Sequence, residues 1–168
     1  VPIRKEGSSL IPRPGHDLDY DWEGRVPFKE MPYLFNLESG YIATANNKTI
    51  DDTFPYYISG LWADPSRAQQ IVSRLDTLRA ASVDDMKSIQ LDYTSLFAKE
   101  ITPYFLSVNV TKENEKINKS IEILKDWDFI ENPDSKGALI FHSVLRQLVI
   151  ELFGDELSLL GDKYLEAF

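Results

Sequence analysis

The chain has 168 residues, of which 43% are hydrophobic and 12% aromatic, enough apolar material for one ordinary core and well outside the range of disordered proteins. Eighteen Lys and Arg against 27 Asp and Glu give a net charge of −9, which repels phosphate backbones and argues against nucleic acid as a partner. The lack of cysteine excludes disulfides, zinc–thiolate sites and thiol catalysis. The sequence contains no run of 18 apolar residues, so we expect no membrane span.

The first third of the chain has the composition of strands and loops. Residues 1–62 hold most of the prolines and glycines, which divide the segment into short runs bounded by turn residues. Tyr33–Phe35 and Tyr41–Ala45 flank a polar stretch that ends at Gly40, a residue that readily takes a positive φ. We therefore expect these two runs to pair as an antiparallel hairpin.

The period of the apolar residues becomes helical after Trp62. Asp64 is a suitable cap and Pro65 a suitable first-turn residue. They precede an apolar stripe at helical spacing, formed by Ala68, Ile71, Val72, Leu75 and Leu78. The pattern predicts the first helix.

Three further helices are expected. The second begins at a capping box in residues 82–85, continues through Phe97 and is ended or kinked by Pro103. The third covers about residues 112–127, and the fourth covers residues 136–153, with Gly154 as a natural stop.

These elements predict an α+β fold of two parts. Short antiparallel strands and loops occupy residues 1–62, and a helical domain occupies residues 63–168. The chain starts at Val1 without Met and stops at Phe168 within an apolar pattern, so we expect a fragment of a longer protein.

The residues by themselves identify no catalytic site. His16 and His142 are far apart in sequence, and neither belongs to a Ser-His-Asp pattern. Asp17, Asp19 and Asp21 would share one face of an extended strand, where a solvated acidic face is favoured over a metal site. No glycine-rich phosphate loop is present.

Several stretches, taken together, resemble one family. They are Asp21–Gly24 with Val26–Phe28, Asn36–Asn47, Phe54–Tyr57, Trp62, Arg67, the run Gln90-x-Asp92-x-x-Ser95-x-x-Ala98, and Trp127–Asp128. In order and spacing they resemble the penicillin acylase family of N-terminal-nucleophile hydrolases, whose members include acylases of cephalosporins and acyl-homoserine lactones. The resemblance covers nearly the whole chain.

The resemblance implies an internal segment of the larger (beta) subunit of an αββα hydrolase. In such enzymes the nucleophile is the first residue of the mature subunit, usually Ser, and its own α-amine acts as the base. Val1 has no hydroxyl or thiol, so the nucleophile is expected elsewhere in the precursor. The segment alone is expected to be inactive, with the rest of the precursor and a small amide substrate as its partners.

The resemblance also implies two site residues. By position, Asn46 matches the asparagine whose side-chain amide donates into the oxyanion hole, and Arg67 matches the active-site arginine. We further hypothesise that Arg67 holds the side-chain oxygen of Asn46 so that the amide points correctly. The alternatives are a turn at Asn46–Asn47 and a solvated or carboxylate-paired Arg67.

The chain departs from the family pattern at three places. Some members bind calcium through an Asp shortly before the Trp, but residues 56–60 here contain no carboxylate. We therefore expect no metal or cofactor in this segment, and a calcium site is left open for the full-length protein. The usual Asn-Pro is Asn36-Leu37, and the usual Trp-Asp-Gly ends in Phe129. Family resemblance also implies a periplasmic or secreted protein. The alternative function is a non-catalytic helical binding module that retains the family packing.

Overall fold

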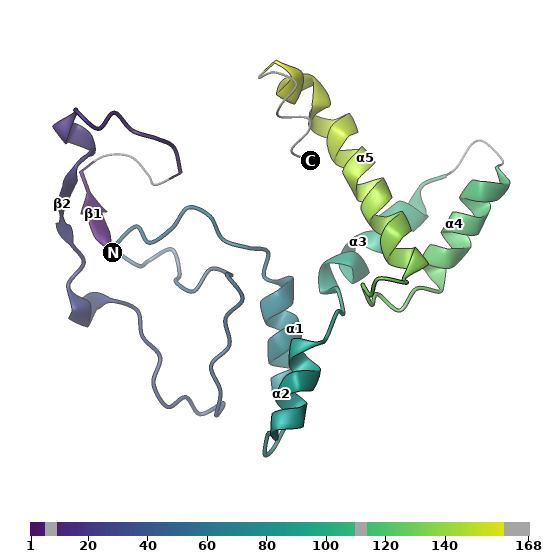
Figure 1. Cartoon of the computed structure of the whole chain (residues 1–168), viewed down its shortest axis with the longest axis horizontal. Helices are drawn as coiled ribbons and strands as arrows, with labels where there is room; N and C mark the ends of the chain where they lie inside the picture. Colours follow the sequence, from purple (N-terminus) through teal and green to yellow (C-terminus); the bar gives the residue numbers. More distant parts are fainter. Residues whose placement is uncertain (6–9, 110–113, 160–168) are drawn as a thin grey trace. The chain divides into compact units, whose positions relative to one another are not determined.

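The computed structural model describes residues 1–5, 10–109 and 114–159 (Figure 1). The protein has an α+β fold and forms two compact units, Val1–Ala80 and Ala81–Phe168. The sequence analysis placed the boundary near Trp62, where the composition changes. That division, into segments 1–62 and 63–168, stays a prediction. The elements, in order, are strand β1 (Pro2–Arg4), 3-10 helix η1 (Leu18–Tyr20), strand β2 (Trp22–Arg25), 3-10 helix η2 (Phe28–Glu30), and helices α1 (Ser66–Leu75), α2 (Val83–Gln90), α3 (Leu96–Ser107), α4 (Glu115–Lys125) and α5 (Lys136–Ser158).

Strands β1 and β2 form an antiparallel pair in the first unit. Pro2 lies opposite Arg25 and Ile3 opposite Gly24, and the register shifts between Ile3 and Arg4. The N–H of Val26 donates to the carbonyl of Val1 at 3.0 Å and extends the pairing by one bond.

The hairpin predicted for Tyr33–Phe35 and Tyr41–Ala45 is wrong, because neither run is a strand. Gly40 does take a positive φ of 77° and its N–H bonds the carbonyl of Leu37, but the turn leads into no ladder. Tyr33 and Phe35 are 81% and 83% exposed. Cross-strand packing stabilises a pair of strands, and these rings have nothing to pack against within the unit.

The three aspartates before β2 do not lie on an extended strand. Residues Leu18–Tyr20 form η1, and the Asp17 carboxylate caps it by accepting the N–H of Asp19 at 3.0 Å. Asp19 pairs with Lys5, and Asp21 accepts the N–H of Trp22 at 2.7 Å. Local capping explains why aspartates recur here.

Helix α1 begins as predicted. The Asp64 carboxylate accepts the N–H of Ser66 at 2.9 Å, and this contact together with the Ser66 hydroxyl lowers the pKa of Asp64. Pro65 precedes the first helical residue, and Ala68 is the buried residue of the stripe. The capped start fixes the first turn of α1, which carries Arg67.

The second predicted helix is two helices. Ser82 and Asp85 form the expected capping box, but α2 ends at Gln90. The Asp92 carboxylate then accepts the N–H of Thr94 at 3.0 Å, and Ser95 caps the new helix α3. A side chain that bonds the backbone locally competes with the helix ladder and ends it.

Two predicted helix stops do not act as stops. Helix α3 continues through Pro103 to Ser107, and α5 continues through Gly154 to Ser158. A glycine in a helix costs only about 0.5–1 kcal/mol relative to alanine, too little to end a long helix. The third predicted helix is α4, Glu115–Lys125, and its predicted start at Lys112 lies outside the described residues.

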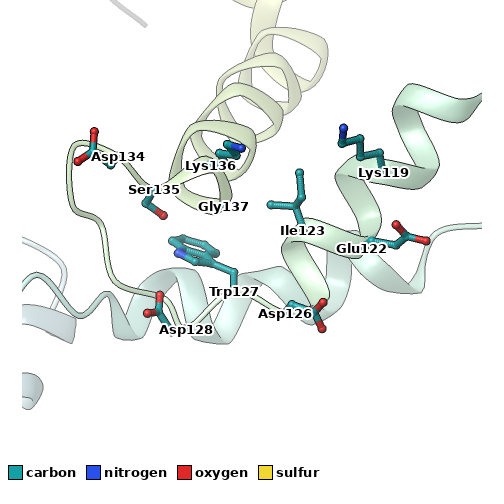
Figure 2. A pocket seen from close by; sticks show the side chains of 10 residues that line it. All are labelled: Lys119, Glu122, Ile123, Asp126, Trp127, Asp128, Asp134, Ser135, Lys136 and Gly137. Atoms are coloured by element: carbon teal, nitrogen blue, oxygen red, sulfur yellow. The ribbon is translucent and has the colours of Figure 1, made fainter.

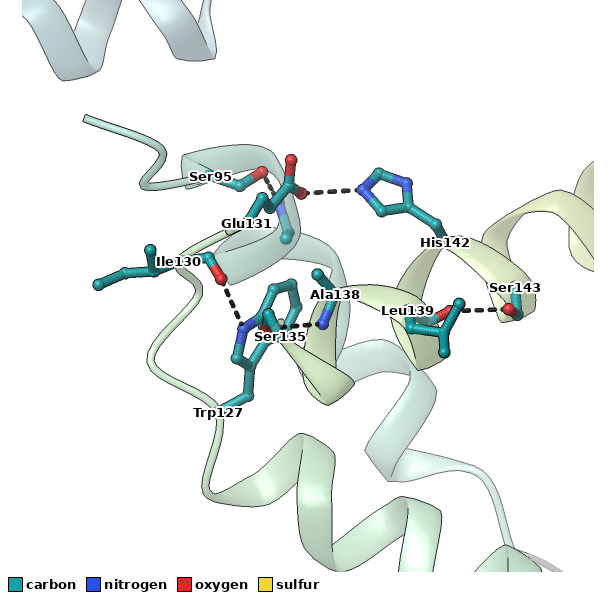
Figure 3. A network of polar contacts seen from close by, with 10 residues as sticks. Ser95, Trp127, Ile130, Glu131, Ser135, Ala138, Leu139, His142 and Ser143 are labelled. Carbon is teal, nitrogen blue, oxygen red and sulfur yellow. Dashed lines mark hydrogen bonds and ion pairs between the residues drawn. The ribbon is translucent and has the colours of Figure 1, made fainter. Parts of the chain in front are cut away.

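The core of the second unit is built around Phe141. This side chain is fully buried, and its ring lies 5.7 Å from that of Trp127, 5.5 Å from Phe105 and 6.1 Å from Phe97. Trp127 also donates from its indole N–H to the carbonyl of Ile130 at 3.3 Å (Figure 3). Aromatic packing therefore joins α3, the loop after α4, and α5.

Among the described residues, helix α5 is long enough and apolar enough to cross a membrane, judged by length and composition alone. The first turns of α5 bury Gly137, Ala138 and Phe141, and 17% of its apolar 18-residue window is buried. The core helix of a soluble protein meets the same length and composition criteria, so this property is weak evidence for a span.

Candidate active site

The predicted oxyanion donor, Asn46, lies in a tight turn of the first unit. Its φ is 61°, in the left-handed region that asparagine tolerates better than most residues. The backbone carbonyl of Asn46 accepts the N–H of Ala63 at 2.8 Å. Ala45 just before it is buried, whereas the Asn46 side chain is exposed rather than enclosed in a core.

Arg67, in the first turn of α1, bonds this turn directly. Its Nη2 donates to the carbonyl of Ala45 at 2.8 Å and to Oδ1 of Asn46 at 2.9 Å. The sequence analysis proposed this second contact, and it is present. One guanidinium nitrogen thus fixes both the backbone before Asn46 and the side chain of Asn46.

The contact with Arg67 determines which end of the Asn46 amide is free. A guanidinium only donates hydrogen bonds, so the atom facing it must be the amide oxygen, and Nδ2 is left as the donor. Within residues 1–5, 10–109 and 114–159, no group accepts a hydrogen bond from this Nδ2. The site therefore presents an unused neutral N–H donor.

The charge of Arg67 is not neutralised locally. Among the described residues it has no ion pair with a carboxylate, which leaves the predicted carboxylate-paired alternative without a partner in that part of the chain. A guanidinium keeps its charge at all ordinary pH values. Arg67 is an exposed residue whose charge is screened by solvent, so it acts on Asn46 mainly through the 2.9 Å contact with Oδ1.

A third contact fixes the approach to the turn. The Tyr41 hydroxyl donates to the carboxylate of Asp76, directly after α1, at 2.5 Å. Donation to this carboxylate raises the pKa of Tyr41. Both ends of α1 thereby hold the segment that contains Asn46.

From the sequence, Asn47 was expected only as part of the alternative turn at Asn46–Asn47, and no role in the site was assigned to it. Its Oδ1 accepts the N–H of Ala45 at 3.0 Å, and its Nδ2 donates to the carbonyl of Lys48 at 3.2 Å. The Asn-Asn pair could have predicted these two bonds, because asparagine side chains commonly bond nearby backbone in turns.

The other candidate groups lie elsewhere. His142 is in the second unit and pairs with Glu131 at 3.1 Å (Figure 3), and His16 follows a turn residue in the first unit. In the described part of the chain, no group of three or more His, Asp or Glu could hold a metal ion. Within the first unit, the structure thus brings Asn46 together with Arg67.

A surface pocket of about 590 Å³ opens at the start of α5 in the second unit (Figure 2). Carboxylates and two lysines surround the Trp127 ring there, and neither Asn46 nor Arg67 takes part. The lining residues are Lys119, Glu122, Ile123, Asp126, Trp127, Asp128, Asp134, Ser135, Lys136 and Gly137.

Comparisons with known proteins agree with the resemblance seen in the sequence. The chain is 28% identical over 171 residues to the acyl-homoserine lactone acylase QuiP of Pseudomonas syringae pv. syringae, an alignment that covers 93% of this chain and 20% of the relative. It is 35% identical over 95 residues to the penicillin acylase 2 proenzyme of a Pseudomonas strain, covering 56% of this chain and 12% of the relative. It is 27% identical over 143 residues to penicillin G acylase of Escherichia coli, covering 80% and 17%.

The chain therefore spans about a fifth, or less, of the length of these curated relatives. All three are acylases by name, so the matched region is that of acyl-amide hydrolases. The family model of penicillin amidase matches residues 1–168, the whole of the sequence. This chain belongs to the penicillin amidase family.

Proposed function

We propose that this chain forms part of the active site of an amide hydrolase that removes an acyl group from a small amide. The single observation that carries the proposal is the bond from Arg67 Nη2 to Asn46 Oδ1, which leaves Asn46 Nδ2 as an unused donor. The names of the relatives suggest penicillins or acyl-homoserine lactones as the substrate class, and the family resemblance adds cephalosporins.

In this proposal Asn46 stabilises the tetrahedral intermediate. When a nucleophile attacks an amide carbon, the carbonyl oxygen gains negative charge, and a fixed N–H donor stabilises that charge at the moment it forms. A neutral carboxamide does this at any pH, because it need not titrate. Loss of one such donor costs about 3 kcal/mol in the transition state.

Arg67 organises the site. Its donors hold Asn46 in place, and its charge disfavours protonation of a nearby α-amine, which would lower the pKa of that amine and keep it a free base. The nucleophile and its α-amine come from elsewhere in the precursor, because this chain spans only about a fifth of the length of its relatives. The isolated chain is therefore inactive.

The partner in this proposal is the remainder of the same precursor, completing an αββα fold. Large apolar side chains of the first unit are exposed to solvent. Phe28, for example, is 92% exposed. In the second unit a groove of about 700 Å³ runs between α3, α4 and α5, lined by apolar residues such as Ile117, Leu124 and Leu148. Apolar surface of this extent is typical of an interface. Family resemblance favours a periplasmic or secreted location.

The test uses the full-length protein and the variant Asn46→Gly. Glycine accepts a φ of 61° without strain, so this variant removes the amide and leaves the backbone relaxed. We expect kcat for an acyl-homoserine lactone or phenylacetyl amide to fall by about 10²–10³-fold, as for loss of one oxyanion donor. Asn46→Asp, which replaces the Nδ2 donor by oxygen, is expected to lose at least as much.

Asn36→Gly is the matched control, because Asn36 is also left-handed, with φ 49°, and has no bond to Arg67. It should retain activity. An Asn46→Gly variant as active as the wild type would exclude the catalytic role. A full-length protein that lacks Ser, Cys or Thr at the start of its larger subunit would favour the non-catalytic binding module.

A further inference from the structure

We infer that Asn47 is a positioning residue for catalysis: by bonding the backbone of Ala45, it holds the neighbouring Asn46 amide in its donating orientation. The inference rests on the proposed role of Asn46 and extends it to a residue with no direct contact to the reacting atoms.

The geometry around Ala45 carries the inference. The N–H of Ala45 donates to Asn47 Oδ1 at 3.0 Å, and the carbonyl of Ala45 accepts from Arg67 Nη2 at 2.8 Å. Ala45 itself is buried, with 8% of its surface exposed. The N–H of Ala45 is thus held by Asn47, and its carbonyl is held by Arg67.

Asn46 needs this support because its backbone is left-handed. A non-glycine residue keeps such a conformation only where its surroundings over-determine it. Three bonds do so here: Asn47 to Ala45, Arg67 to Ala45, and Ala63 to the carbonyl of Asn46. Of these, only the first comes from a side chain outside the proposed catalytic pair.

The half-buried Asn47 side chain is also anchored at its other end. Its Nδ2 donates to the carbonyl of Lys48 at 3.2 Å, so the carboxamide bridges backbone on both sides of the turn. A bridge of this kind restricts the rotation of the peptide groups on either side of Asn46, and with it the direction of the Asn46 side chain.

Catalysis is sensitive to that direction. An oxyanion donor must lie about 2.7–3.1 Å from the charged oxygen, and a misplacement of about 1 Å can cost on the order of 10²-fold in rate. The bond to the oxygen strengthens only in the transition state, so loss of positioning lowers kcat and leaves KM nearly unchanged.

The experiment compares Asn47→Leu with Asn47→Asp in the full-length protein. Leucine has a similar shape but no acceptor, whereas aspartate keeps the oxygen that accepts from Ala45. We expect Asn47→Leu to lower kcat about 10- to 100-fold at nearly constant KM, and Asn47→Asp to retain most of the activity. Circular dichroism establishes that each variant is folded, and Asn47→Ala replaces Asn47→Leu if the latter does not fold.

A double-mutant cycle separates positioning from general stability. Once Asn46→Gly has removed the amide, a positioning residue has nothing left to position, so adding Asn47→Leu should change kcat little further. Multiplying effects would show that Asn47 acts independently of Asn46 and would overturn the inference. If Asn46→Gly lowers kcat and Asn47→Leu does not, the inference alone fails. If Asn46→Gly does not lower kcat, both the proposed function and this inference fail.

Discussion

Phe129 has a left-handed backbone although it is not a glycine. Its φ is 62°, and the family resemblance led us to expect glycine at this place, the residue for which such a backbone is least costly. The Phe129 ring contacts Trp127 at 5.2 Å between centroids, and its carbonyl accepts the N–H of Ser95 at 2.9 Å. The departure from Trp-Asp-Gly thus combines a strained backbone with an added aromatic contact.

We predict that Phe129→Ala destabilises the protein more than Phe129→Gly. Both variants lose the ring contact, but alanine also keeps the left-handed strain, which costs about 1–2 kcal/mol for a residue with a Cβ. The free energies of unfolding in urea, followed by circular dichroism, should differ by about 1 kcal/mol in favour of glycine. The opposite order, which is usual where φ is negative, would contradict the backbone assigned to Phe129.

At this scale the sequence predicted contacts only where a family resemblance supported them. The bond between Arg67 and Asn46 was anticipated in that way, and it is present. The catalytic roles of the two residues stay predictions. Tyr41 went unassigned because its partner, Asp76, depends on how the loop folds over α1, which no local pattern encodes. The bonds of Asn47 are local, to Ala45 and Lys48, and only the turn alternative at Asn46–Asn47 anticipated them.

Among the elements, helices were predicted better than strands. Amphipathic spacing and capping residues act within one or two turns, so α1, α4 and α5 start or end close to their predicted bounds. The break between α2 and α3 involves the Asp92 carboxylate, which accepts the N–H of Thr94, and the N–H of Ser95, which donates to the distant carbonyl of Phe129. Only the second contact lacks a local signal. The failed hairpin shows the same dependence, since strands need partners at a distance.

Gly137 allows the packing of α5 on the preceding loop to be tested. A Cβ added there would lie 2.2 Å from the Trp127 ring, and the ring belongs to the buried core. We expect Gly137→Ala to destabilise the protein by about 1–3 kcal/mol, the usual cost of overpacking a core, although alanine favours the helix by itself. Urea unfolding followed by circular dichroism measures this change.

Gly24→Ala serves as the control, because an added Cβ there meets nothing within 4 Å. It should alter the free energy of unfolding by no more than about 0.5 kcal/mol, as exposed surface changes usually do. Equal stability of Gly137→Ala and the wild type would mean that Trp127 can move away from α5 at little cost.

As a whole molecule, the chain has less core than its composition allows. Among the described residues of the first unit, the buried apolar residues are Val26, Ala45 and Ala68, all small, whereas aromatic side chains such as Phe28, Tyr33 and Phe35 are mostly exposed. The sequence predicted an α+β chain and could not predict this exposure, because hydrophobic patterning indicates what can be buried and not which partner buries it.

We predict that the isolated chain self-associates, or that residues 1 to about 50 exchange their amide hydrogens rapidly. Exposed aromatics such as Phe28 and Phe35, with the unpaired edges of β1 and β2, favour association. Sedimentation should show oligomers that increase with concentration and with salt, which screens the net charge of −9. Phe28→Ser with Phe35→Ser should reduce them. A monomer with that region fully protected from exchange would contradict the prediction.

The turn at Asn47 also affects the choice of expression host. Asn47, Lys48 and Thr49 read Asn-x-Thr, the acceptor sequence for N-linked glycans in the eukaryotic secretory pathway. The glycan would attach to Nδ2, the atom that donates to the carbonyl of Lys48, and would put a bulky sugar one residue from the proposed oxyanion donor. A host without N-glycosylation avoids this modification, and Thr49→Ala removes the acceptor sequence while leaving Asn47 in place.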